Sequence, residues 1–159
     1  MYRFFCKLIS LNNMKILIIN KSVYDKKLKI FINKKYIEIE NRIKYINKEY
    51  DITIIEIKEE IEIKLIDIEE NINNNKLYID KTIYTLQYFE NKISYGIIKD
   101  INNNKYKYIC NNKNGNLPIL NISNNKIIGI NIKNDNNNYN KGLFINNIIE
   151  EIIINEFNK

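Results

Sequence analysis

The stretch Glu49-Tyr-Asp51-Ile-Thr-Ile-Ile-Glu-Ile57 sets a polar turn directly before six residues that are almost all apolar or β-branched. β-branched side chains favour extended backbone, and a short, nearly continuous apolar run is typical of a strand buried on both faces. Residues 14–19 have the same character. We therefore predict two buried strands, one of which begins immediately after Asp51.

Outward from this stretch, isoleucine recurs at alternate positions. Residues 36–40, 61–64 and 66–68 alternate between apolar and polar side chains, as half-buried strands do. Asparagine-rich breaks follow at residues 71–75, 102–104, 111–116, 124–125 and 134–138. Because asparagine tolerates the left-handed backbone of tight turns, these breaks indicate hairpin connections. The pattern predicts an all-β barrel or sandwich of about a dozen short strands.

The last segment has a helical period instead. Its apolar residues recur at intervals of three and four, with glutamates between them: Ile148, Ile149, Ile152, Ile153 and Phe157. This spacing predicts an amphipathic C-terminal helix that packs on the barrel. With a seam at residues 71–75, we predict three parts: an N-terminal barrel over 1–70, a C-terminal barrel over 76–145 and a helix over 146–159.

The composition excludes several kinds of chemistry. The 159 residues include no histidine, so Ser-His-Asp, Cys-His and His-ligated zinc sites are ruled out for this chain. The two cysteines, Cys6 and Cys110, lack CxxC spacing. We predict neither a metal nor a cofactor, and we interpret both thiols as small buried side chains.

Two free thiols and no recognisable secretory segment predict a cytoplasmic protein. No apolar stretch approaches the ~18 residues of a membrane helix, so no membrane contact is expected.

The formal net charge of +6 is a weak signal for a nucleic-acid partner. Lysine, asparagine, isoleucine and tyrosine are the residues that an AT-rich genome encodes most readily. The lysines also alternate with acids, as in Lys58-Glu59-Glu60, whereas a nucleic-acid binder gathers its cations on one face. A nucleic-acid partner is therefore not favoured.

Four local patterns occur in one order along the chain. They are residues 16–25, residues 49–57, residues 83–88 with 93–98, and residues 110–120 followed by Lys126-Ile-Ile-Gly129-Ile. Together they resemble the trypsin-like serine peptidases of the chymotrypsin fold (PA clan), over nearly the whole chain. The resemblance implies two antiparallel barrels of the six-stranded type, the first of them trimmed, with a C-terminal helix.

The resemblance also implies positions for a catalytic triad. In the family, a strand runs into a turn that carries the histidine base, and an Asp-Ile-Thr-Ile-Ile strand carries the acid that orients it. Asp51 matches the acid, and Ser22 falls where the family has histidine. Interpretations of Asp51 as an acceptor for backbone amides, and of Ser22 as a turn hydroxyl or a partner of Asp51, stay open.

The family's nucleophile lies in a Gly-x-Ser-Gly-x-Pro loop. Gly115 and Asn116 match the residues before it, and Leu117 is all that stands between them and Pro118. The Ser-Gly pair is therefore missing. Gly129 and Gly142 match two further glycines of the family pattern.

A serine hydroxyl cannot accept a proton near neutral pH as imidazole does, so base and nucleophile are both lost. The resemblance then implies a pseudoenzyme, a catalytically inactive homologue that binds a peptide or protein segment. Three alternatives stay open: an active endopeptidase with unorthodox residues, such as a serine with Lys21 or Lys113, or Cys110 as nucleophile; a basic nucleic-acid module; and a chain without a selected role.

Overall fold

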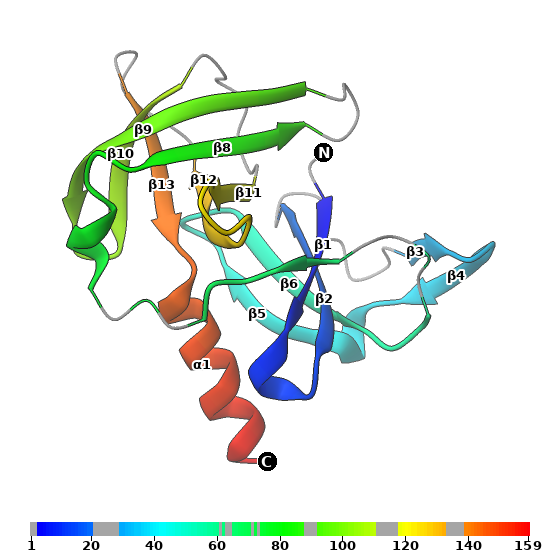
Figure 1. Ribbon diagram of the computed structural model, residues 1–159. Coiled ribbons are helices and arrows are strands. Elements are labelled where there is room, and N and C mark those ends of the chain that lie inside the picture. The colour runs from blue at the N-terminus through cyan, green and yellow to red at the C-terminus, as the bar shows by residue number, and fades with distance from the viewer. Residues whose placement is uncertain are drawn as a thin grey trace. The chain divides into compact units, whose positions relative to one another are not determined.

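The computed structural model describes residues 3–20, 29–60, 62, 65–70, 72, 74–87, 92–110, 118–132 and 139–159 (Figure 1). The chain divides into two compact units, Met1–Asp67 and Ile68–Lys159. A separate cluster of buried apolar side chains lies in each unit.

The first unit is built on a five-stranded sheet in the order β5-β6-β2-β1-β7. Its strands are β1 (Arg3–Leu8), β2 (Met14–Asn20), β5 (Ile43–Asn47), β6 (Ile52–Ile57) and β7 (Ile66–Asp67). The two predicted buried strands are β2 and β6, which pair antiparallel and each have a neighbour on both sides. Ile52, Ile54 and Ile55 are buried, as a run without alternation predicts.

A hairpin of β3 (Lys29–Ile32) and β4 (Lys35–Glu38) covers part of the core of this unit. Ile30, Ile32 and Ile37 from the hairpin pack with side chains of β2 and β6. Asn33 and Lys34 form the two-residue turn, both with positive φ, which is the geometry that hairpins of this length favour. Two 3-10 turns, η1 (Ile9–Leu11) and η3 (Glu40–Arg42), complete the unit.

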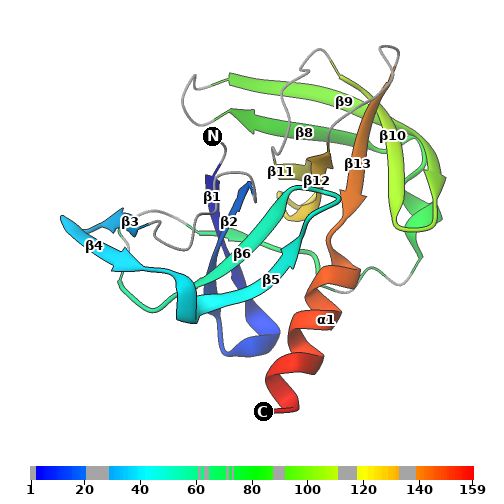
Figure 2. The ribbon, with the colours of Figure 1, turned by 180° about the vertical axis from the view of Figure 1, so that it is seen from behind.

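The second unit is a closed barrel in the order β10-β13-β12-β11-β8-β9 (Figures 1 and 2). Its elements are the 3-10 helix η4 (Asn75–Tyr78), β8 (Thr82–Gln87), β9 (Lys92–Asn102), β10 (Lys105–Cys110), β11 (Pro118–Asn121), β12 (Ile127–Ile132) and β13 (Asn140–Phe144). Tyr106, Tyr108 and Phe144 fill its interior, and the rings of Tyr106 and Phe144 lie 4.5 Å apart between centroids.

Two glycines leave room for the Tyr106 ring. A Cβ atom at Gly129 or Gly142 would collide with that ring, so a larger residue at either position would displace it. Burial raises the pKa of Tyr106, and the neighbouring Tyr108 raises it further. The Tyr106 hydroxyl has no hydrogen-bond partner among the described residues.

The helix α1 (Asn146–Phe157) ends the chain's regular structure. Ile148, Ile149 and Ile152 are buried, as predicted. Phe157 was expected on the same face, but its side chain is 76% exposed. It follows Ile152 by five positions, which rotates it about 140° away from that residue on a helix. No helix in the described part of the chain is long and apolar enough to cross a membrane.

The predicted fold class is confirmed: the structure is mostly strand, with one closed six-stranded barrel and one C-terminal helix. In the first unit the described strands form an open sheet and a hairpin, consistent with a trimmed first barrel.

The backbone angle φ is positive at Asn12, Asn13, Asn103 and Asn125, as predicted for asparagine in tight turns. Of the strand predicted at 61–64, only Glu62 is described, and it lies in a bend.

Tyr106→Phe should raise the free energy of unfolding by about 1 kcal/mol, because it removes a buried hydroxyl that has no hydrogen-bond partner among the described residues. Gly142→Ala should lower it by about 1 to 3 kcal/mol, because the added methyl group meets the ring. Chemical denaturation of both variants measures the two effects. A less stable Tyr106→Phe variant would contradict this account of the hydroxyl.

Candidate functional site

Asp51 lies at the end of the turn between β5 and β6 and is half-buried. Its φ of 57° is in the left-handed region, which aspartate and asparagine adopt more readily than most residues. Within the turn, the Asn47 side-chain oxygen accepts the Tyr50 backbone N–H at 3.0 Å, and the Asn47 amide donates to the Tyr45 hydroxyl at 3.1 Å. This geometry gives Asp51 a structural reason to be aspartate, apart from any catalytic one.

The end of β2 and the start of β6 lie side by side, since Asn20 pairs with Ile52. Asp51 directly precedes Ile52, and Ser22 comes two residues after Asn20 in the sequence. The segments that lead to the two predicted positions are therefore neighbours. Ser22 itself lies outside the described residues.

The predicted nucleophile loop also lies outside the described residues, including Gly115, Asn116 and Leu117. The described chain stops at Cys110, the last residue of β10, and resumes at Pro118, the first of β11. The triad assignment therefore stays a prediction, with only Asp51 placed.

The two thiols occupy different surroundings. Cys6 in β1 is fully buried, and burial raises the pKa of its thiol far above the usual range, so it is not a nucleophile near neutral pH. Cys110 is half-buried and packs against the core of the barrel. Its carbonyl oxygen accepts a hydrogen bond from the Asn140 side chain at 3.1 Å. Both environments are those of structural cysteines.

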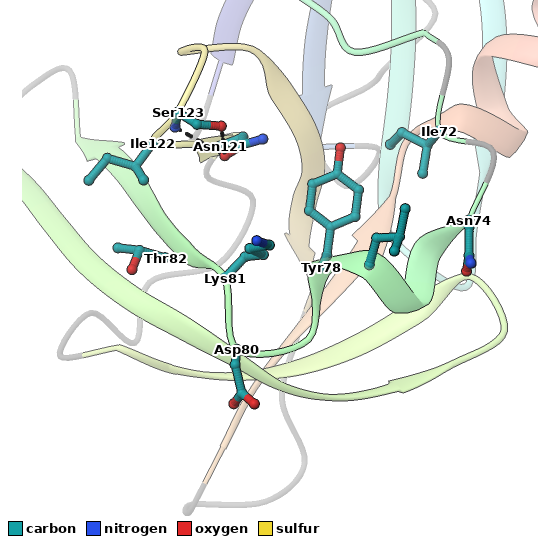
Figure 3. Close-up of a pocket in the computed structure, with 10 residues that line it drawn as sticks. Ile72, Asn74, Tyr78, Asp80, Lys81, Thr82, Asn121, Ile122 and Ser123 are labelled. Carbon is teal, nitrogen blue, oxygen red and sulfur yellow. Dashed lines mark hydrogen bonds between the residues drawn. The ribbon is translucent and has the colours of Figure 1, made fainter.

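A pocket of about 580 Å³ opens in the second unit between η4, the turn into β8, and the β11–β12 turn (Figure 3). Its lining mixes apolar with polar side chains: Ile72, Asn74, Leu77, Tyr78, Asp80, Lys81, Thr82, Asn121, Ile122 and Ser123. Asn121 ends β11, whereas Pro118 at the other end of that strand follows the predicted nucleophile loop. The pocket thus lies at the far end of β11 from Pro118.

Backbone hydrogen bonds fix the rim of this pocket. The Asp80 N–H donates to the Ile98 carbonyl at 2.8 Å, and the Ile98 N–H donates to the Lys81 carbonyl at 3.2 Å. Asp80 takes positive φ, its carboxylate is 3.5 Å from the Lys99 ammonium, and it points away from Tyr78 (Figure 3). The rim is therefore held both by β9 and by η4, since the Lys81 N–H also donates to the Tyr78 carbonyl at 3.1 Å.

The chemistry available in the pocket is hydrogen bonding. Burial raises the pKa of Tyr78, and the charge of Glu69 adds to the effect, so the phenol is neutral near pH 7. The Ser123 hydroxyl donates to the Asn121 side-chain oxygen at 2.8 Å. An amide oxygen is not a proton acceptor of useful basicity, so this serine is not activated.

Sequence reasoning did not find this pocket. Its residues come from three segments, 72–74, 77–82 and 121–123, and only the first of them lies in a predicted asparagine-rich break. Asn74 caps η4 by accepting the Lys76 N–H at 3.1 Å, and Asn121 accepts the Ser123 N–H at 3.1 Å. Such turns do not indicate a cavity in the sequence, because the cavity forms only when the barrel brings them together.

Among the described residues, no cluster of three acidic or cysteine side chains that could hold a metal ion is present.

Comparisons with known proteins show the fold. No family model and no curated protein sequence matches the chain. Among solved structures, it is similar to a serine endoprotease from Yersinia pestis, with a TM-score of 0.59 and 17% identity over 89% of this chain. The chain spans about half of that protein, 54% of its length. The fold is therefore that of chymotrypsin-like serine peptidases.

The Asp51 turn can be tested with a matched pair of variants, Asp51→Gly and Asp51→Ala. Both remove the carboxylate, but only glycine adopts left-handed backbone without strain. We expect Asp51→Ala to be about 1 kcal/mol less stable than Asp51→Gly in chemical denaturation. Equal stability of the two variants would contradict a backbone role for this position.

Proposed function

We propose that the chain is a catalytically inactive homologue of trypsin-like serine peptidases that binds an extended peptide or protein segment. The observation that carries the proposal is the combination of a serine endoprotease fold with Ser22 at the position of the base and Leu117 where the nucleophile is expected. Peptide hydrolysis on this scaffold needs both a nucleophile and a base to activate it. Neither is present at the matching positions.

The described serines support this proposal over an active hydrolase with unorthodox residues. Ser123 is exposed and bonded to Asn121, and Ser94 lies within β9 opposite Thr85 in the β8–β9 pair. Lys81, which lines the same pocket as Ser123, is exposed. A lysine base requires a buried ammonium whose pKa is depressed by desolvation, and an exposed lysine lacks that desolvation.

The charge distribution also supports a peptide over a nucleic acid. Several cations in the described part of the chain pair with nearby acids, for example Arg42 with Glu59 at 2.6 Å and Lys44 with Glu56 at 3.2 Å. The hydrogen bond from Arg42 lowers the pKa of Glu59, so this pair is charged at neutral pH. Paired cations are less available to phosphate groups.

The edge strand β5, with its exposed Ile46, is the surface that best fits an extended peptide. Among the described strands, β6 is the hydrogen-bonded neighbour of β5, which places β5 at one edge of the five-stranded sheet. The strands of the barrel each have two neighbours. β5 also leads directly into the turn that ends at Asp51. Addition of a peptide strand to such an edge is a common form of peptide recognition.

The catalytic part of the proposal predicts that a fluorophosphonate probe does not label the purified chain at any of its four serines, and that a peptide library is not cleaved. Trypsin serves as the positive control. Covalent labelling at Ser22, Ser94 or Ser123, detected by mass spectrometry, would overturn the assignment as a pseudoenzyme.

The binding part predicts that displayed extended peptides bind at the edge of β5. Ile46 on β5 and Phe31 on the β3–β4 hairpin are both exposed, so Ile46→Glu and Phe31→Glu form a matched pair. Ile46→Glu should lose peptide binding at least tenfold, because it places a charge where the peptide lies. Phe31→Glu should leave peptide binding unchanged.

Binding should depend weakly on salt, in contrast to the steep dependence of a phosphate contact. Peptides that bind the Ile46→Glu variant as tightly as the unchanged protein would contradict the β5 site. Tight binding of nucleic acid with a steep salt dependence would overturn the choice of partner.

A further inference from the structure

The outer face of the β8–β9–β10 sheet is apolar although it is open to solvent. β9 directs Gly96 and Ile98 into the barrel and Ile93, Tyr95 and Ile97 outward, and Tyr95 is 61% exposed. The register places outward side chains of the neighbouring strands beside them: Tyr84 next to Tyr95, Leu86 next to Ile93, and Ile109 next to Ile97. We call these six side chains the apolar outer face. Contiguous apolar surface of this kind is typical of an interaction site.

The geometry of the barrel limits what can cover this face. β8, β9 and β10 each have hydrogen-bonded neighbours on both sides, so no backbone edge is free to pair with an added strand. A partner that lies across the face must satisfy its own backbone groups. An amphipathic helix does so, and helices commonly cover the faces of sheets.

The charges beside the face favour an acidic partner. Lys107 on β10 is opposite Lys141 on β13, and Lys99 follows Ile97 by two residues on β9. Like charges opposite each other on neighbouring strands repel. Asp100, opposite Lys107 on β9, and Asp80, 3.5 Å from Lys99, are the nearby acids. The Asp80–Lys99 ion pair is exposed to solvent. With three lysines against two aspartates, this lysine rim beside the apolar outer face has a net positive charge.

The exposed side of α1 has the complementary character. Ile154 is 58% exposed and Phe157 is 76% exposed. Glu150 and Glu151 precede Ile154 by four and three residues and are also exposed, so all four share one side of the helix. The opposite side holds the helix in its own unit through the buried Ile148, Ile149 and Ile152.

We propose that α1 of one copy of this protein packs on the apolar outer face of a second copy. Ile154 and Phe157 lie against Tyr95 and Ile97, and the two glutamates face the lysine rim. From Glu150 to Phe157 the helix spans ~10 Å, and from Ile93 to Ile97 the strand spans ~13 Å, so the two surfaces match in length.

The contact is between molecules. In both views the helix extends from the side of its unit opposite to β8 and β9, and its buried isoleucines fix it there (Figures 1 and 2). The two surfaces differ, so the contact is head-to-tail and adds copies in a ring or an open chain. This inference does not depend on whether the chain binds peptides.

Sedimentation velocity on the full chain, from micromolar to millimolar concentration, tests the contact. The sedimentation coefficient should rise with concentration. Tyr95→Glu on the face and Ile154→Glu on the helix should each abolish the rise, since both positions are exposed and the folded state should tolerate them. Phe31→Glu, on the exposed side of the β3–β4 hairpin, should leave the rise unchanged.

Mixing the two defective variants gives the decisive result. The Ile154→Glu variant keeps an intact face and the Tyr95→Glu variant keeps an intact helix, so an equimolar mixture should form a dimer and nothing larger. A protein that stays monomeric at all concentrations would overturn the proposal. So would association that survives Ile154→Glu, or a mixture that stays monomeric, since either result means that something other than α1 covers the face.

Discussion

The packing of the barrel in the second unit depends on space in its interior for the aromatic ring of Tyr106. Tyr106 lies in the interior against Phe144, and the space for its ring comes from Gly129 and Gly142 on two neighbouring strands. Because the six strands close on themselves, a ring displaced from this interior could not be accommodated by opening an edge. The size of the residues at positions 129 and 142 therefore decides whether the Tyr106 ring fits, although these positions are distant from Tyr106 in the sequence.

The fold could be predicted from the sequence where its causes are local. The continuous apolar run after Asp51 became β6, and Asn12, Asn103 and Asn125 took left-handed backbone at turns. Each outcome depends on a few neighbouring residues and on steric preferences that composition reveals. In a chain with only four glycines, asparagine and aspartate supply most of these conformations.

The features that sequence reasoning missed depend on partners that are distant in the chain. Phe157 fits a helical apolar period but lies outside the buried face, since that face is set by what Ile148 and Ile152 pack against. The pocket beside Tyr78 exists because the barrel brings the β11–β12 turn to η4. For the candidate site, the sequence identified Asp51 directly before β6, and the pairing of Asn20 with Ile52 places the end of β2 beside the start of β6.

The proposed loss of catalysis is compatible with an intact fold because the two depend on different residues. In the sequence, the matched positions for base and nucleophile come after β2 and before β11, whereas the barrel is held by interior side chains such as Tyr106 and Ile119. Side chains in connections contribute little to a packed core, so substituting them changes chemistry and leaves stability nearly unchanged. A fold that keeps its core but loses its catalytic residues still holds its strands in place, so the exposed faces and edges of those strands are retained. In such a scaffold, binding depends on surfaces, and the two surfaces proposed for it are the edge of β5 and the outer face of β9.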